Sequence, residues 1–192
     1  MKNLIESYKV RLTNALNALS QNDIQNLANS LNNAWVSKNC IYICGNGGSA
    51  GNAIHLANDF LYGAGKKSGC GMRVEALSAN ASVLTCLAND VGYESIYSEQ
   101  LKVKANPGDI LIVLSGSGNS PNVVKAIEIG NELKMKTFAI LGFSGGVCKN
   151  IAQNVLHFEV NDMQVAEDLQ LIIGHMCMQY LSQLNLSDHK YS

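Results

Sequence analysis

The start of the chain carries two segments in which apolar side chains recur at every third or fourth position. This spacing predicts a helix over residues 2–19. Residues from Ser20 to Asp23 interrupt the pattern with side chains typical of a helix start, and a second helix follows. The apolar positions of the two helices are Leu4, Ile5, Tyr8, Leu12, Ala15, Leu16 and Leu19, then Ile24, Leu27, Leu31, Ala34 and Trp35. We expect residues 1–38 to form a helical hairpin that either covers a sheet or, as its many apolar positions favour, packs against another subunit.

From Cys40 onward, short apolar runs alternate with segments of helical spacing. Strands are predicted near residues 40–44, 73–77, 109–115, 137–142 and 155–160, and helices near 48–62, 80–89, 93–105, 121–134 and 163–185. Such alternation is typical of an α/β fold, a parallel sheet with helices on both faces. We find no linker, repeat or low-complexity tract. The prediction is therefore one domain over 1–192, with an α/β core at 39–185 and a tail at 186–192.

Two loops rich in glycine and serine each follow a predicted strand directly. The first is Gly45-Asn46-Gly47-Gly48-Ser49, and the second is Ser115-Gly116-Ser117-Gly118-Asn119-Ser120-Pro121. A loop of this kind exposes backbone N–H groups at the positive end of the next helix, a geometry that holds phosphate. Ligands of open parallel sheets bind beyond the carboxyl ends of the strands. If the two strands are neighbours, the loops share one crevice.

The second loop is the stronger signal, because three hydroxyl groups and a firm helix start at Ser120-Pro121 accompany its glycines. Neither loop matches the lysine-containing loop of triphosphate-binding proteins or the glycine pattern of dinucleotide-binding proteins. A phosphate monoester on a small molecule is the better match. The alternative is two tight turns with nothing bound.

Histidine and carboxylate residues recur on two of the predicted helices. His55 and Asp59 are four residues apart and share a helix face, as is suitable for a metal or for a base and the group that orients it. On the last helix, Glu167 and Asp168 precede His175, and helical geometry slightly prefers Asp168 as the partner of His175. The alternative is ordinary packed or solvated side chains.

Charge and cysteine content narrow the class of protein. The chain has 192 residues, 47% of them hydrophobic, and a net charge of −1, which argues against a nucleic-acid or anionic membrane partner. No basic-then-apolar leader and no membrane-length apolar run is evident. The six cysteines lack zinc-ribbon spacing and mostly occupy apolar runs, so we interpret them as buried thiols in a reducing cytoplasm. A nucleophilic Cys44 is the less favoured alternative.

Taken together, these motifs resemble the sugar isomerase (SIS) domain, and most of all the phosphoheptose isomerases. The resemblance rests on the string from Cys44 to Ser49, on His55 six residues later, on the serine loop before Pro121, and on His175 in the terminal helix. It extends over about residues 5 to 185. It implies a three-layer, flavodoxin-like fold with a five-stranded parallel sheet, a homotetramer with active sites at subunit interfaces, and zinc in some members.

The resemblance also implies roles for particular residues. The sugar end of the substrate would contact Asn46, Gly47, Gly48 and Ser49, with Asn89 and Asp90 nearby, and the phosphate would lie in the loop that holds Ser115, Gly116, Ser117 and Ser120. His55, Asp59, Glu167 and His175 match the four positions that bind metal or move protons. Among these, Asp59, Glu167 and His175 are the candidate catalytic residues.

Several positions depart from the family pattern. Asp59 replaces the usual glutamate, Glu167 the usual glutamine and Gly116 the usual threonine, while Gly63 stands where a basic residue is usual, with Lys66 and Lys67 nearby. These changes leave the phosphate-binding hydroxyls of Ser115, Ser117 and Ser120 in place. They leave open the identity of the sugar and the carboxylate that takes the proton.

The resemblance therefore implies an aldose–ketose isomerase, which would convert sedoheptulose 7-phosphate to D-glycero-D-manno-heptose 7-phosphate through a cis-enediol. Other interpretations remain: an isomerase of a different ketose phosphate, an etherase or synthase acting on an amino sugar phosphate, or a protein that binds a sugar phosphate or a protein partner without catalysis.

Overall fold

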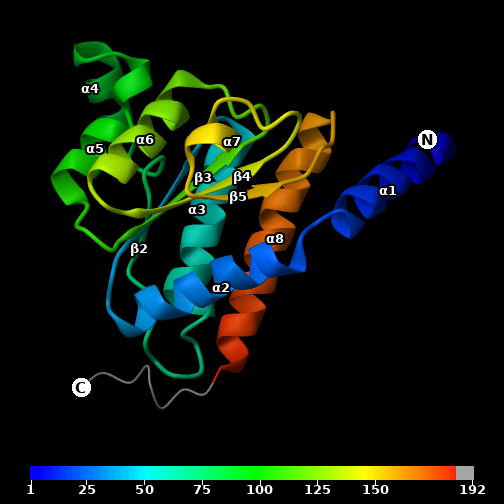
Figure 1. The fold of residues 1–192 in the computed structure, drawn as a ribbon, viewed down its shortest axis with the longest axis horizontal. Coiled ribbons are helices and arrows are strands. Elements are labelled where there is room, and N and C mark those ends of the chain that lie inside the picture. Colours follow the sequence, from blue (N-terminus) through cyan, green and yellow to red (C-terminus); the bar gives the residue numbers. More distant parts are fainter. Residues whose placement is uncertain (185–192) are drawn as a thin grey trace.

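A five-stranded parallel sheet forms the centre of the computed structural model, which describes residues 1–184 (Figure 1). The predicted tail at 186–192 lies outside the described residues. The strands are β1 (Ile41–Gly45), β2 (Val74–Ala76), β3 (Ile110–Ser115), β4 (Lys136–Leu141) and β5 (Asn154–His157), in the spatial order β2-β1-β3-β4-β5. This is the order of flavodoxin-like folds. Strand β2 is added on one side of β1, and β3 and the later strands are added on the other side, so the strand order reverses between β1 and β3. The predicted α/β fold with a five-stranded parallel sheet is confirmed.

Helices cover both faces of this sheet (Figure 1). They are α1 (Lys2–Asn17), α2 (Gln21–Val36), α3 (Gly48–Asn58), α4 (Ala81–Asp90), α5 (Ser98–Lys104), α6 (Pro121–Glu132), α7 (Cys148–Ile151) and α8 (Met163–Gln183). Helices α2, α3 and α8 pack on one face, and α5, α6 and α7 pack on the other.

Alternation of side chains along the strands divides the core into two layers. In β1, Ile41 and Ile43 belong to the core beneath α2, α3 and α8, whereas Tyr42 and Cys44 belong to the opposite core. All five residues of β1 and all six of β3 are buried, as expected for central strands of a parallel sheet. The rigid strand ends then hold the loops that follow them.

Three elements differ from the sequence prediction. The helix predicted near 48–62 ends in a π-helical segment, η1 (Asp59–Gly63), and the one predicted near 93–105 is divided into a 3₁₀ turn, η2 (Tyr93–Ser95), and α5. Helix α7 was not predicted, because four residues are too few to show a helical repeat. π-Helical turns are rare in proteins, and those that do occur often lie at functional sites.

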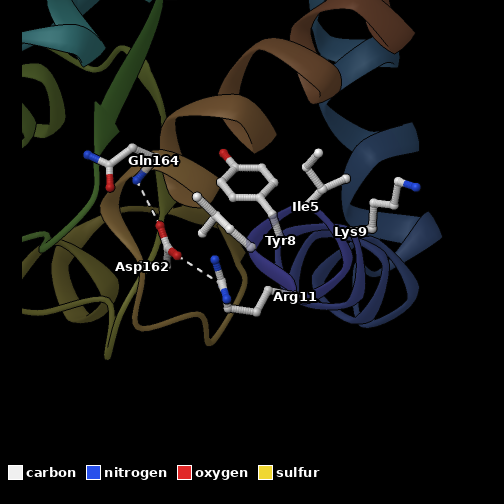
Figure 2. Close-up of a pocket in the computed structure, with 7 residues that line it drawn as sticks. Ile5, Tyr8, Lys9, Arg11, Asp162 and Gln164 are labelled. Atoms are coloured by element: carbon white, nitrogen blue, oxygen red, sulfur yellow. Dashed lines mark hydrogen bonds and ion pairs between the residues drawn. The ribbon is translucent and has the colours of Figure 1, made fainter. Parts of the chain in front are cut away.

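The two N-terminal helices are present, but α1 extends away from α2 rather than folding back along it (Figure 1). It rests against the start of α8, where Arg11 Nε donates to Asp162 Oδ2 at 3.0 Å (Figure 2). Asp162 also caps α8 by accepting from the backbone N–H groups of Gln164 and Val165. A largely apolar groove of about 530 Å³ lies here, lined by Leu4, Ile5, Tyr8, Lys9, Arg11, Asp162 and Gln164.

Helices α3 and α8 lie side by side and approach closely (Figure 1). A Cβ atom at Gly174 of α8 would collide with the side chain of Leu56 on α3. Asn52 Nδ2 of α3 donates to the Glu167 carbonyl oxygen at 2.9 Å and to Gln170 Oε1 at 3.0 Å. Glycine at 174 therefore allows the helix spacing on which the neighbouring side chains depend.

No helix in the described residues is both long and apolar enough to cross a membrane.

Replacing Gly174 tests this spacing. We expect Gly174→Ala to destabilise the fold by about 1–3 kcal/mol, because overpacking pushes α3 and α8 apart. The matched control is Gly51→Ala on α3, where an added Cβ meets nothing within 4 Å, so that the better helix propensity of alanine is unopposed. Urea unfolding measures both, and an equal effect of the two substitutions would contradict this account of the helix contact.

Candidate functional site

The parallel pairing of β1 with β3 brings the two glycine- and serine-rich loops together. Gly45, the last residue of β1, is in register with Leu114 of β3. A cavity of about 260 Å³ opens between the loops. It is lined by Asn46, Gly47, Gly48, Ser49, Leu114, Ser115, Gly116, Ser117, Ser120, Met163 and Glu167. The structure thus brings together eight of the ten predicted substrate-binding residues and the predicted catalytic Glu167.

The serine loop is held in shape by its own hydrogen bonds and by a third loop. Ser115 Oγ accepts from the Gly118 N–H at 3.0 Å, and Ser117 Oγ accepts from the Asn119 N–H at 3.3 Å. The Ser120 hydroxyl makes no cap hydrogen bond at the start of α6, although the helix begins there as predicted. The glycine-rich loop after β4 packs against Gly118, whose carbonyl oxygen accepts from the Cys148 N–H at 3.0 Å. Sequence reasoning did not identify this supporting loop.

The first loop is fixed by side chains that sequence reasoning also missed. Asn46 and Asn122 exchange two amide hydrogen bonds, each 2.8 Å long, and the Tyr93 hydroxyl donates to Asn46 Oδ1 at 3.0 Å. The Tyr97 hydroxyl donates to the Gly45 carbonyl oxygen at the end of β1. No local pattern marks these residues, since each acts on a loop distant in sequence.

Glu167 and Met163 of α8 form the wall of the cavity opposite the serine loop. The carboxylate of Glu167 lies against Gly48, at the start of α3, where the helix dipole favours a negative charge. Met163 lies over Gly116 so closely that a Cβ atom at 116 would collide with its sulfur atom. The absence of a side chain at Gly116, one of the departures from the family pattern, therefore leaves room for Met163.

Three of the four predicted metal-binding residues converge farther along α3 and α8. His55 Nε2 and His175 Nε2 lie 2.9 Å apart, and each lies 3.4 Å from Asp59 Oδ2 at the start of the π-helical segment. One ligand atom from each residue lies within 4.8 Å of the others. The side chains of His55 and His175 are 49% and 40% exposed, and that of Asp59 is 18% exposed. Glu167 is not in this group.

Asp168 has a different partner from the one that helical geometry preferred. Its carboxylate accepts from the Tyr8 hydroxyl at 2.5 Å, and this hydrogen bond raises the pKa of Tyr8 to about 12. The carboxylate beside His175 is Asp59. The expected pairing of Asp168 with His175 is wrong, because α1 packs against α8 and places the Tyr8 hydroxyl beside Asp168.

Asn89 and Asp90 lie at the exposed end of α4, outside the residues that line the cavity. Asn89 Nδ2 donates to Asp90 Oδ1 at 2.7 Å, and Cys86 Sγ donates to Asp90 Oδ2 at 3.5 Å. That second hydrogen bond raises the pKa of Cys86. Their predicted contact with substrate stays a prediction.

All six cysteines are free thiols. Cys44, Cys148 and Cys177 are buried, Cys40 and Cys70 are partly buried, and Cys86 is exposed, so the expectation of burial is wrong for Cys86. Burial raises the pKa of the Cys44 thiol well above its usual range. Since the thiolate is the reactive form, Cys44 is unsuited to act as a nucleophile.

Comparison with known proteins shows which family and which fold the chain shares. Residues 6–142 match the family model of the SIS domain. The chain is 36% identical over 154 residues to a phosphoheptose isomerase of Akkermansia muciniphila, covering 80% of this chain and 81% of that one. It is 39% identical over 136 residues to one of Helicobacter pylori strain P12, covering 71% and 70% of the two chains. The structure of phosphoheptose isomerase from Neisseria gonorrhoeae shares the fold, with a TM-score of 0.87 at 23% identity over 95% of this chain and 99% of that one.

The support of the serine loop can be tested at Gly118, where φ is +67° and an added Cβ would collide with the carbonyl oxygen of Gly145. We expect Gly118→Ala to weaken the binding of inorganic phosphate at least tenfold, because the loop must shift to relieve the collision. The control is Gly69→Ala, with φ +74° and open space around the Cβ position, which should cost about 1 kcal/mol of stability and leave phosphate binding intact. Calorimetric titration measures the phosphate affinity of both variants, and equal affinities would contradict the prediction.

Proposed function

Because the chain belongs to the phosphoheptose isomerase family of SIS-domain proteins and is a sugar-phosphate isomerase, we propose that it interconverts sedoheptulose 7-phosphate and D-glycero-D-manno-heptose 7-phosphate. One observation carries the proposal. A single cavity is lined by both loops and by Glu167, and the two helices that border it also carry the His55, Asp59 and His175 group.

The phosphate group of the substrate is assigned to the serine loop. Ser115, Ser117 and Ser120 line the cavity with hydroxyl groups, and α6 begins directly behind them. Backbone N–H groups and the helix dipole there favour an anion without the help of a lysine. Anchoring this remote end supplies binding energy that orients the reacting carbons.

The carbonyl end of the sugar is assigned to the histidine group. Gly48 and His55 are seven residues apart on α3, which corresponds to about 10 Å along the helix axis. A sugar chain that extends from the serine loop past Glu167 must therefore be long to reach His175. This distance favours a long ketose phosphate over a short one.

Isomerisation through a cis-enediol moves a proton between C1 and C2 and needs a base together with an acid for the carbonyl oxygen. We assign one role to His175 and the other to a carboxylate, Asp59 or Glu167. Asp59 Oδ2 lies 3.4 Å from Nε2 of both histidines, so it can orient His175 or exchange a proton beside it. Glu167 lies in the cavity itself and is the carboxylate nearer to the phosphate loop.

The His55, Asp59 and His175 group fits a zinc ion. Two imidazole nitrogens and one carboxylate oxygen that converge within 4.8 Å are three ligands of the type zinc prefers, which is the number that leaves a position open in catalytic sites. Zinc bound there would polarise the carbonyl oxygen of the substrate. With Asp59 and His175 both bound to zinc, Glu167 would be the remaining side chain for proton transfer, and His175 would act as a ligand rather than as an acid or a base.

We further propose a homotetramer, in which a neighbouring subunit covers the exposed side of the histidine group. The projecting α1, with its apolar groove at Leu4, Ile5 and Tyr8, supports an interface between copies of the chain. The six free thiols support a reducing, cytoplasmic location.

Replacement of His175 tests the assignment of the reaction. We expect His175→Gln to lower turnover of sedoheptulose 7-phosphate at least a hundredfold, because general acid–base groups contribute about 10²–10⁴-fold. Proton exchange at C1, followed by NMR, measures turnover, and a thermal melt checks that the fold is intact. Full activity in this variant would remove His175 from the mechanism, and a wild-type protein without turnover of any ketose phosphate would favour the non-catalytic interpretation.

Zinc binding is tested on the same group. We expect Asp59→Asn to weaken zinc binding at least tenfold, because a neutral amide replaces the anionic ligand, and we expect exhaustive chelation to lower the activity of the wild type until zinc is restored. Equilibrium dialysis measures zinc affinity, and Asp23→Asn on α2 is the control. Unchanged turnover of a protein shown by elemental analysis to be free of metal would leave acid–base catalysis by the side chains alone.

A further inference from the structure

Residues at three distant positions in the sequence meet at one side-chain amide beside the cavity. Asn46 follows β1, Asn122 lies in the first turn of α6, and Tyr93 begins the 3₁₀ turn after α4. The reciprocal 2.8 Å amide pair joins the first loop to the helix behind the serine loop, and the Tyr93 hydroxyl closes the arrangement at 3.0 Å. Only Asn46 of the three lines the cavity.

The hydrogen-bonding capacity of Asn46 is nearly used up by this arrangement. A side-chain amide offers two N–H donors and an oxygen that accepts two hydrogen bonds. Its oxygen accepts from Asn122 and from Tyr93, and one of its N–H groups donates to Asn122. Within residues 1–184, one N–H of Asn46 remains without a partner. The side chain can therefore act toward a ligand only as a hydrogen-bond donor.

The members of the group differ in how far they are buried. Asn122 is 1% exposed, so its amide has no access to solvent and holds Asn46 from the protein interior. Tyr93 is 58% exposed, and the 3₁₀ turn that it begins packs against α6 and α4. Ser95, at the end of the same turn, accepts from Lys125 Nζ of α6 at 2.8 Å, which ties the turn to the helix that carries Asn122.

We propose that Asn122 and Tyr93 are positioning residues that orient the Asn46 amide as a single donor to an oxygen atom of the sugar, between the phosphate group and the reacting carbons. This inference rests on the proposed function and deepens it, because the Asn46 amide would select a ligand that has an acceptor oxygen between its phosphate group and its reacting carbons. Inorganic phosphate has no sugar oxygen and gains nothing from the amide. The three residues then discriminate a polyhydroxylated phosphate ester from phosphate alone.

Calorimetric titration tests the proposal on Tyr93→Phe, which removes one oxygen from an exposed side chain and leaves the fold intact. Loss of a positioning hydrogen bond should weaken binding of sedoheptulose 7-phosphate about five- to tenfold, with the affinity for inorganic phosphate unchanged. Asn122→Ser should have the same selective effect. The matched control is Tyr180→Phe on α8, which removes a hydroxyl from another partly exposed tyrosine and should change neither affinity.

A double-mutant cycle separates positioning from a general structural effect. In the Asn46→Ala background, Tyr93→Phe should cause no further loss, because the amide that it positions is absent. The proposal would be overturned if Tyr93→Phe lowered the affinity for both ligands equally, or lowered neither affinity. It would also be overturned if Tyr93→Phe caused the same loss of affinity in the Asn46→Ala background, or if the wild-type protein bound the sugar phosphate no more tightly than inorganic phosphate. The comparison needs no turnover, so an inactive wild type would contradict the proposed function and still leave this proposal measurable.

Discussion

The parallel pairing of β1 with β3 is the constraint on which the site depends. It places the ends of two buried strands next to each other, so that the loops after Gly45 and Ser115 face a common cavity. In an open parallel sheet this position, where the strand order reverses, is the place at which ligands bind. An anion can be held there by backbone N–H groups and hydroxyls, which is consistent with a chain whose net charge is only −1.

The close contact of α3 with α8 extends this site away from the sheet. Because Gly174 lacks a side chain, the two helices approach closely enough to place Glu167 against Gly48 at one level and His175 beside His55 at another. Asp59, the first residue of the π-helical segment, lies four residues after His55, and its carboxylate approaches both imidazoles. One pair of helices thus carries Glu167 beside the loops and the His55, Asp59 and His175 group farther along.

Much of this could be predicted from the sequence, because strands, loops and helix starts are encoded locally. The glycine and serine loops and the start of α6 at Pro121 follow from motifs and spacing, whereas the grouping of His55 with His175 is implied only by the family resemblance. The rest depends on tertiary contacts that spacing cannot reveal. Asp168 pairs with Tyr8 because α1 docks on α8, Glu167 lies with the serine loop rather than with the histidines, and Asn122 and Tyr93 hold a loop far away in sequence.

A crystal structure with sedoheptulose 7-phosphate bound tests the central claim most directly, namely that one ligand is held by both loops and extends along α3 and α8. The account predicts the phosphate group among the hydroxyls of Ser115, Ser117 and Ser120, the sugar chain beside Asn46 and Glu167, and the carbonyl end at His175. A phosphate group bound away from the serine loop, or a sugar chain directed away from the α3 and α8 pair, would contradict it.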